Sequence, residues 1–424
     1  MSLGNAKRRS ASTAFLAATL IIMVVLVGLT AYSMYQVQVI NRKLSDISSS
    51  VSNINSTVMS EVSSRLANES EYLGELLSQL NTSVSSQIAK IRGEVSNLEA
   101  TIGFPVAIVD ALNQTVYVPS MPHRIVTLDP ASTEIVLAVG AAGQLVGVDN
   151  NSLVYLPPPF NYTINRLYQN GSVASIGSTW SSPCVEAILA LRPDLVIGAA
   201  GWGYDDYIAS VLSQYGIPVL LLPSSSSLSD VYKSIIMVGE ATGHVKEAVS
   251  IVENDSAIVD SLESRLQGLP EVRVAIIAWV NPTYVAGGGT FQDDLITLGG
   301  GVNAFANSSG WPVVTAEELL EANPQVIILM SNGGLFNESY LIQWLNSSIG
   351  PAYKNISAIA SGRVYLVEGW YESVLSEPSV LVPYGALLIA EILHPQAFNI
   401  SSLPSVISPS TLGVPGVNLE GGPA

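Results

Sequence analysis

The sequence has few charged residues and few of the residue types that bind nucleic acid. Only 12% of its 424 residues are charged, and the acidic excess gives a formal net charge of −17. Nucleic-acid binding depends on Lys and Arg clustered along the phosphate backbone, and such clusters are scarce in this chain. We therefore exclude nucleic acid as a partner.

Cysteine and histidine are almost absent. A single cysteine, Cys184, excludes a disulfide framework and also a cysteine zinc site or an iron–sulfur cluster held by one chain. The three histidines, His123, His244 and His394, lie far apart in the sequence. We expect no cofactor and no protein-ligated metal, because such sites need several converging ligands. No motif pairs a nucleophile with a base, so the sequence does not predict an enzyme.

A long uncharged run follows a short basic cluster at the N-terminus. Residues 13–35, after Lys7 to Arg9, are apolar enough and long enough to cross a bilayer as a helix. The positive-inside rule leaves residues 1–12 in the cytoplasm and the chain after Tyr35 outside. A cleavable secretory signal is the alternative, although no small-x-small cleavage site follows the run. The run also resembles the class III, pilin-like signals of some archaeal binding proteins, which retain the apolar helix. We expect a single-pass membrane anchor.

Residues 36–103 form a polar, serine-rich segment with a heptad-like apolar pattern. Apolar residues alternate at spacings of four and three from Ile40 to Val58, and again from Leu73 to Leu98 after a break near Glu61 to Glu69. This pattern predicts a coiled-coil-like stalk with a stutter, through which copies of the chain would associate. A lone helical or partly disordered spacer is the alternative, because the flanking Ser and Asn are poor helix formers. The segment also carries Asn-x-Ser/Thr sequons, as does the rest of the chain, which agrees with a location outside the cell.

From residue 104 the chain alternates short apolar runs with helical stretches, and it does so twice. This alternation predicts α/β lobes with parallel sheets at residues 104–228 and 269–398. Residues 229–268 lack strands and read as a helical spine between the lobes, with one long helix from Val245 to Leu266. Residues 399–424, rich in Pro, Gly and Ser, predict a flexible tail.

Aromatic residues in loops mark a candidate binding site. Four tryptophans stand at strand or helix ends beside Ser, Gly and Asn, namely Trp180, Trp202, Trp311 and Trp370, the last followed by Tyr371. Exposed aromatics that converge between two lobes suit a large flat ligand. Trp279, within a strand, and Trp344, at helical spacing, are better explained as core residues.

Three segments resemble the periplasmic binding proteins that serve ABC importers of cobalamin, iron-siderophores and haem. They are HRIVTLDPASTEIVLAVGAAGQLVGV, SIGSTWSSPCVEAILALRPDLVIG and SGWPVVTAEELLEANPQVIILM, in that order. The resemblance covers about residues 104 to 395 and implies two Rossmann-like lobes joined by a long rigid helix, as in class III binding proteins. The anchor and stalk have no counterpart in that family.

The resemblance is nearest to the cobalamin binders and assigns roles to the loop residues. Trp180, Trp202 and Trp311 match or lie near pocket tryptophans, and Trp370 with Tyr371 falls in the last pocket loop. Asn151 stands where those proteins have a pocket tyrosine. A corrinoid or a neutral siderophore is expected, because few Lys or Arg lie near these loops to bind an anionic siderophore or haem.

The resemblance also implies a docking role for one exposed glutamate on each lobe. Glu186 and Glu317 match the glutamates that contact arginines of the ABC permease, although a glutamate in a first helical turn also complements the helix dipole. We expect a membrane-anchored, extracytoplasmic binding protein that delivers a metal chelate. The alternatives are a surface structural or sensory protein on an oligomeric stalk, and an enzyme of the nitrogenase-like or chelatase type, which would need absent metal-ligating residues.

Overall fold

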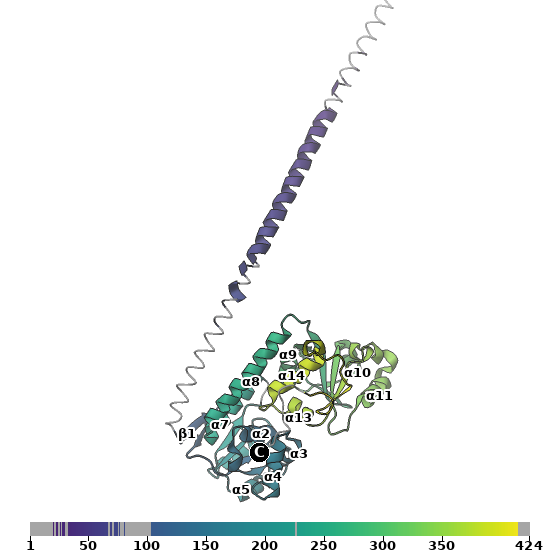
Figure 1. The fold of residues 1–424 in the computed structure, drawn as a ribbon. Helices are drawn as coiled ribbons and strands as arrows, with labels where there is room; N and C mark the ends of the chain where they lie inside the picture. The colour runs from purple at the N-terminus through teal and green to yellow at the C-terminus, as the bar shows by residue number, and fades with distance from the viewer. Residues whose placement is uncertain are drawn as a thin grey trace, which may run out of the picture. The chain divides into compact units, whose positions relative to one another are not determined.

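The computed structural model describes residues 33–66, 103–224 and 227–413, together with isolated positions between 20 and 80. The chain divides into two units, residues 1–94 and 95–424, and each is described by itself. In the first unit, residues 33–66 are helical throughout (Figure 1). No helix among the described residues is both long and apolar enough to cross a membrane. Most of the predicted anchor, residues 13–35, and part of the predicted stalk lie outside the described residues.

The second unit begins with a β-hairpin and an all-parallel sheet, which together form the N-lobe. The hairpin consists of β1 (Val106–Val109) and β2 (Thr115–Val118). The sheet has the strand order β5-β4-β3-β6-β7 and is built from β3 (Ile125–Thr127), β4 (Leu145–Val148), β5 (Ala174–Ser175), β6 (Leu195–Ala199) and β7 (Val219–Leu222). Strands β3 and β7 are buried along their whole length, as expected for strands covered by helices on both faces.

The helices of the N-lobe connect these strands, and α2, α3 and α7 begin at side-chain caps. They are α2 (Pro130–Ala138), η1 (Ala141–Gln144), α3 (Asn150–Tyr155), α4 (Phe160–Gln169), α5 (Val185–Ala190), α6 (Asp205–Ser213) and α7 (Leu228–Thr242). Asp129 and Asp149 end the turns after β3 and β4 and cap α2 and α3 by accepting from Ser132 N and Ser152 N. Strands β3 and β4 therefore lead almost directly into a capped helix, which fixes these two turns at the carboxyl edge of the sheet.

A long helix runs between the lobes, as the sequence predicts. Helix α8 (Val245–Leu266) packs against α7, and also against α9 and α14 of the second lobe (Figure 1). Its 22 residues correspond to about 33 Å of helix. The predicted spine is thus confirmed for this helix, while α7 packs on α2 and β1 and belongs to the N-lobe.

The C-lobe is a mixed sheet with a parallel centre. Its strand order is β11-β9-β8-β12-β13-β14, with β10 also paired to β8. The strands are β8 (Val272–Trp279), β9 (Thr283–Val285), β10 (Gly301–Asn303), β11 (Val313–Val314), β12 (Val326–Met330), β13 (Val364–Val367) and β14 (Val406–Ile407). The helices are α9 (Phe291–Leu298), α10 (Ala316–Ala322), α11 (Glu338–Ile349), η2 (Gly350–Asn355), α12 (Ser357–Ala360), α13 (Trp370–Ser376), α14 (Val382–Leu393) and η3 (Pro395–Phe398). The predicted parallel sheet is correct for β8, β12 and β13, whereas β9 and β11 are antiparallel.

The prediction of a flexible tail from residue 399 is wrong for the described part of that segment. Strand β14 pairs in parallel with β13, and Ile407 is completely buried. Leu412 is also buried, and its carbonyl accepts a 2.6 Å hydrogen bond from the Tyr371 hydroxyl. The apolar side chains between the prolines and serines therefore complete the C-lobe. The prediction failed because it rested on the composition of the segment alone.

Direct contacts join the two lobes near α2, α3 and α13. The Ser379 hydroxyl donates to the Glu134 carboxyl, and both side chains are buried. The Ser373 hydroxyl donates to the Tyr155 carbonyl at 2.6 Å. Burial raises the pKa of Glu134 to about 8. Burial also raises the pKa of Glu377 to about 8, and the charges of Asp129, Glu134 and Asp149 add to this effect.

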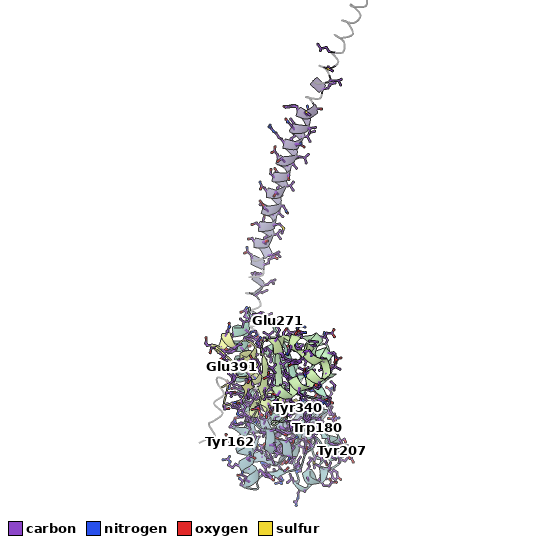
Figure 2. The ribbon with its side chains drawn as sticks, turned by 90° about the vertical axis from the view of Figure 1, so that its right-hand side faces the viewer. Tyr162, Trp180, Tyr207, Glu271, Tyr340 and Glu391 are labelled. Carbon is purple, nitrogen blue, oxygen red and sulfur yellow. The ribbon has the colours of Figure 1, made fainter. Side chains whose placement is uncertain are left out.

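The Tyr371 hydrogen bond gives a first prediction. Tyr371→Phe should lower the free energy of unfolding by about 1–2 kcal/mol, because the Leu412 carbonyl is left buried without that donor. Urea unfolding followed by circular dichroism measures the change. Tyr162→Phe, at an exposed tyrosine of α4, is the matched control and should change stability little (Figure 2). Equal stability of the two variants would show that the C-terminal segment does not depend on this contact.

The lobe contact gives a second prediction, on pH. Below the ordinary Glu pKa of 4.5 the Glu134 carboxyl is protonated in the folded and unfolded states alike, and above about 8 it is ionised in both. Between these values the folded protein holds a proton that the unfolded chain releases, so the free energy of unfolding should fall as pH rises. Urea unfolding at a series of pH values measures this slope.

Glu134→Gln should make that slope shallower, because glutamine keeps an acceptor for Ser379 and removes the ionisation. The slope should not vanish, since Asp205, Asp255 and Glu391 also have raised pKa values. Glu321→Gln removes an exposed glutamate of α10 and controls for the loss of one charge. An unchanged slope in Glu134→Gln would contradict this account of the lobe contact.

Candidate ligand-binding site

Parallel strands carry the loops that follow them to one edge of each sheet. In the N-lobe the turns after β3, β4 and β6 lie at this edge, together with the loop that leads from β5 to α5. In the C-lobe the corresponding edge holds the ends of β8, β12 and β13. Ligands of open α/β sheets bind at such carboxyl edges, so the side chains there are the candidates for a site.

Two tryptophans of the N-lobe lie together at this edge. The ring centroids of Trp180 and Trp202 are 4.9 Å apart with an interplanar angle of 49°. Their exposed fractions are 60% and 41%, so both rings present a face to solvent. The structure thus brings together two residues that the sequence predicted separately. We call them the N-lobe aromatic pair.

A close backbone approach holds this pair in place. The Tyr204 amide donates to the Thr179 carbonyl at 3.0 Å, and the Thr179 hydroxyl donates to the Leu128 carbonyl at 2.6 Å. A Cβ at Gly203 would lie 2.8 Å from the Thr179 carbonyl oxygen, and Gly203 has a φ of +50°. Only glycine fits this crossing without displacement, so the loops of Trp180 and Trp202 are locked against each other.

A second aromatic group occupies the carboxyl edge of the C-lobe. Trp279 meets Phe336 edge to face at 4.7 Å between centroids, and Phe336 lies 5.5 Å from Tyr340. Trp279 and Tyr340 are each 39% exposed, while Phe336 is buried beneath them. We call these three residues the C-lobe aromatic cluster. Tyr340 and Trp180 both lie near the boundary between the lobes in Figure 2.

The prediction that Trp279 is a core residue is wrong. It is the last residue of β8, where the strand emerges at the carboxyl edge, and its ring is partly exposed. Phe336 and Tyr340 were missed because no loop tryptophan marks the segment between β12 and α11. Their position after a buried parallel strand is the signal that could have identified them. Trp344 is half-buried against the C-lobe core, as predicted.

The other predicted ligand residues have different surroundings. Trp311 is 43% exposed, in a loop held by the hydrogen bond from the Gly287 amide to the Gly310 carbonyl. Asn151 is half-buried at the start of α3, and its amide donates to Asp149 at 2.8 Å. Trp370 is half-buried on the core and meets the Tyr371 ring edge to face at 4.5 Å. Tyr371 itself is 2% exposed, which leaves its side chain almost no surface for a ligand.

Three buried carboxyl groups lie under the N-lobe loops. Asp129 and Asp149 cap their helices, and Asp205 accepts from the Ala199 amide at 3.0 Å. Burial, together with the charge of Asp129, raises the pKa of Asp205 to about 8 and that of Asp149 to about 6. The interactions that lower these pKa values are hydrogen bonds, not cations. An anionic ligand would therefore find no compensating charge in this part of the site.

The described residues offer little to a metal or to a nucleophilic mechanism. No group of three His, Cys, Asp or Glu side chains among them could hold a metal ion. Burial raises the pKa of the Cys184 thiol above its usual range, which keeps it protonated and poorly reactive. The chemistry that this edge supports is contact with aromatic rings and hydrogen bonding, which is binding chemistry.

The two predicted docking glutamates occupy equivalent places in the lobes. Glu186 is the second residue of α5 and Glu317 is the second residue of α10, and both are exposed. In α10 the capping box is formed by Thr315 and Glu318, so Glu317 is not needed to cap the helix. Each glutamate is thus available at the start of a helix that enters its lobe from the carboxyl edge.

A groove elsewhere on the N-lobe is a competing location for a ligand. It has a volume of about 630 Å³ and is lined by the hairpin, α6 and the start of β7, including Asp110, Tyr117 and Ser210. Its lining includes Val219 and Leu221 of β7 but neither Trp180 nor Trp202. Neither aromatic group contributes to it.

Known proteins resemble this chain in sequence. A family model described as "Periplasmic binding protein" matches residues 125–369. The ABC transporter substrate-binding lipoprotein YvrC of Bacillus subtilis, itself uncharacterized, is 29% identical over 300 residues, which cover 70% of this chain and 87% of YvrC. A vitamin B12-binding protein of Salmonella typhimurium is 29% identical over 259 residues, which cover 60% of this chain and 90% of the length of that protein.

Solved structures resemble the chain in fold. The vitamin B12-binding protein BtuF of Vibrio cholerae superposes with a TM-score of 0.52 at 21% identity. The match covers 65% of this chain and 98% of the BtuF chain. The molybdate-binding protein MolA of Haemophilus influenzae gives a TM-score of 0.57 at 22% identity, covering 70% and 94%. Since the family model covers more than half of the residues and the two-lobed fold agrees with it, the chain belongs to the periplasmic binding protein family, whose members bind substrates for transport and are not enzymes.

Proposed function

We propose that this protein is a membrane-anchored, extracytoplasmic solute-binding protein that captures a metal chelate between its lobes and delivers it to an ABC importer. A corrinoid of the cobalamin type is the favoured ligand, with an iron-siderophore or haem as the other candidates. The observation that carries the proposal is the presence of two aromatic groups, the N-lobe aromatic pair and the C-lobe aromatic cluster, at the carboxyl edges of the two sheets.

The composition of the loops narrows the ligand class. The loops at residues 176–184, 199–204, 279–283 and 331–337 contain no Lys or Arg. Haem propionates and anionic siderophores are best bound by cations, which these loops lack. A broad, weakly charged macrocycle gains most from several exposed aromatic faces. The names of the vitamin B12-binding relatives support the same ligand class.

The permease of the importer is the proposed protein partner, contacted on its extracytoplasmic face. Glu186 and Glu317 lie at matching positions on the two lobes, where each could accept a charge-assisted hydrogen bond from an arginine. Contacts on both lobes would fix the orientation of the binding protein on the transporter. The lipoprotein name of the Bacillus relative supports a protein held at the membrane, and residues 13–35 would serve here as the anchor.

The structural or sensory alternative is favoured by one observation, the exposed helix at residues 33–66. A simple tether does not need a row of apolar residues along a helix. This function and solute delivery are compatible, because the stalk and the lobes belong to separate units of the chain.

Tryptophan fluorescence tests the ligand. The six tryptophans of the full chain all lie after residue 179, so the signal reports on the lobes alone. Titration with cyanocobalamin, cobinamide, haem and a ferric hydroxamate should give saturable quenching by a corrinoid. Trp180→Ala and Trp202→Ala should each weaken binding about tenfold, because a buried ring contact is worth about 1.4 kcal/mol.

Tyr215→Ala, at an exposed tyrosine that follows α6, is the control and should bind as the wild type does. Equal affinity of Trp180→Ala and wild type would remove the N-lobe aromatic pair from the site. Binding of haem without binding of any corrinoid would contradict the proposed ligand, although the assignment to the family would stand.

Charge reversal tests docking separately from capture. The double variant Glu186→Lys with Glu317→Lys should bind the ligand normally and lose at least about tenfold in uptake by vesicles that contain the cognate permease, since two charge-assisted contacts are reversed. Glu321→Lys introduces the same charge on α10 at a different exposed position and should transport normally. Normal uptake by the double variant would show that these glutamates do not dock.

A further inference from the structure

The helix at residues 33–66 carries a continuous apolar row that the single chain leaves in solvent. Its members are Val37, Ile40, Leu44, Ile47, Val51, Ile54 and Val58. All seven are between 50% and 63% exposed. The spacing alternates between three and four, so the row stays on one side of the helix over three heptads. No charged residue interrupts it.

The side chains in the row have a distinct order. In heptad positions, d is Ile40, Ile47 and Ile54, while a is Val37, Leu44, Val51 and Val58. Two-stranded parallel coiled coils favour leucine at d, because a β-branched d side chain packs poorly against a single partner helix. Isoleucine at every d position shifts the preference to three or four strands. We propose that this row joins three or four copies of the chain into a parallel coiled coil.

The composition of the helix requires such a partner. Serine and asparagine fill most of the outward positions, and both have low helix propensity. The hydroxyls of Ser50 and Thr57 donate back to the carbonyls of Asp46 and Asn53, contacts that compete with the helical backbone instead of supporting it. An isolated helix of this composition gains too little from its own backbone, so burial of the apolar row between copies supplies the missing stabilisation.

A second copy fits the row better than a different protein would. Lys43 is the only charged residue at the flanking e and g positions from Asn41 to Thr57, so these positions offer no alternating charge pattern that would select an unlike partner. The row is self-complementary when copies lie in register, since each a or d side chain meets its own equivalent. The parallel direction rests on the proposed membrane anchor, which would start all copies at the same surface.

The row continues past Val58 with one shift. Val62 and Leu66 follow at spacings of four, which shifts the row around the helix, and both are exposed. Glu61 and Arg65 lie one residue before them and form a 2.9 Å ion pair along the helix. The ion pair thus flanks the shifted row and does not occupy it. An assembly of this kind would hold several pairs of lobes close together, so that a released ligand is recaptured by a neighbouring copy.

The mass of the full chain in detergent tests the proposal. Light scattering corrected for detergent should give three or four times the protein mass of 44.7 kDa. Ile47→Asp with Ile54→Asp should give monomers. Ser49→Asp with Ser56→Asp, two outward positions on the same turns, adds the same charge and should leave the assembly intact. A monomeric or dimeric wild type, or an intact assembly of Ile47→Asp with Ile54→Asp, would overturn the proposal.

Disulfide crosslinking tests the direction and register. In a Cys184→Ser chain, Ile40→Cys should crosslink to itself on oxidation, while Ser49→Cys should not. Because Ile40 lies near one end of the row, only parallel copies in register bring two such residues together, and failure to crosslink would contradict the proposal. Ligand titration of the same preparations is an independent readout, so loss of the assembly and loss of the proposed binding function can be told apart.

Discussion

The common direction of the strands in the two sheets determines where this protein can act. Because β3, β4, β5 and β6 run in parallel, their following loops meet at one edge, and the same holds for β8, β12 and β13 in the other lobe. The aromatic residues of both lobes lie at these edges. Buried hydrogen bonds, such as that from Thr179 to the Leu128 carbonyl, hold the N-lobe rings in fixed positions. The proposed site is therefore built on turns fixed by hydrogen bonds, with little ordering cost left for a ligand.

Low charge is the second feature that connects the parts. The lobes meet through a neutral hydrogen bond between Ser379 and Glu134, and the nearby carboxyl groups have raised pKa values because burial penalises their ionised forms. The binding edges have aromatic rings where other ligands would need arginine or lysine. An importer of anions would require the opposite arrangement. The acidic, weakly charged composition of the whole chain is thus reflected in the chemistry of its site.

Periodicity predicted the scaffold well and the site only in part. Helix Val245–Leu266 begins and ends where the pattern places it, because apolar spacing and turn residues are local signals. Trp180 and Trp202 stood out as loop tryptophans. Trp279 was assigned to the core because a strand residue carries no sign of where its strand emerges. The segment around Ile407 was assigned to a tail because its pairing partner lies more than 35 residues away in sequence.

The proposed function depends on a flat chelate lying between the two aromatic groups. The most direct test is a crystal structure of the chain with cobinamide, in which the corrin ring identifies its own contacts. The corrin ring should lie between the N-lobe aromatic pair and the C-lobe aromatic cluster, in contact with Trp180 and Tyr340. A ring seated instead in the groove between the hairpin and α6, near Tyr117 and Ser210, would contradict it.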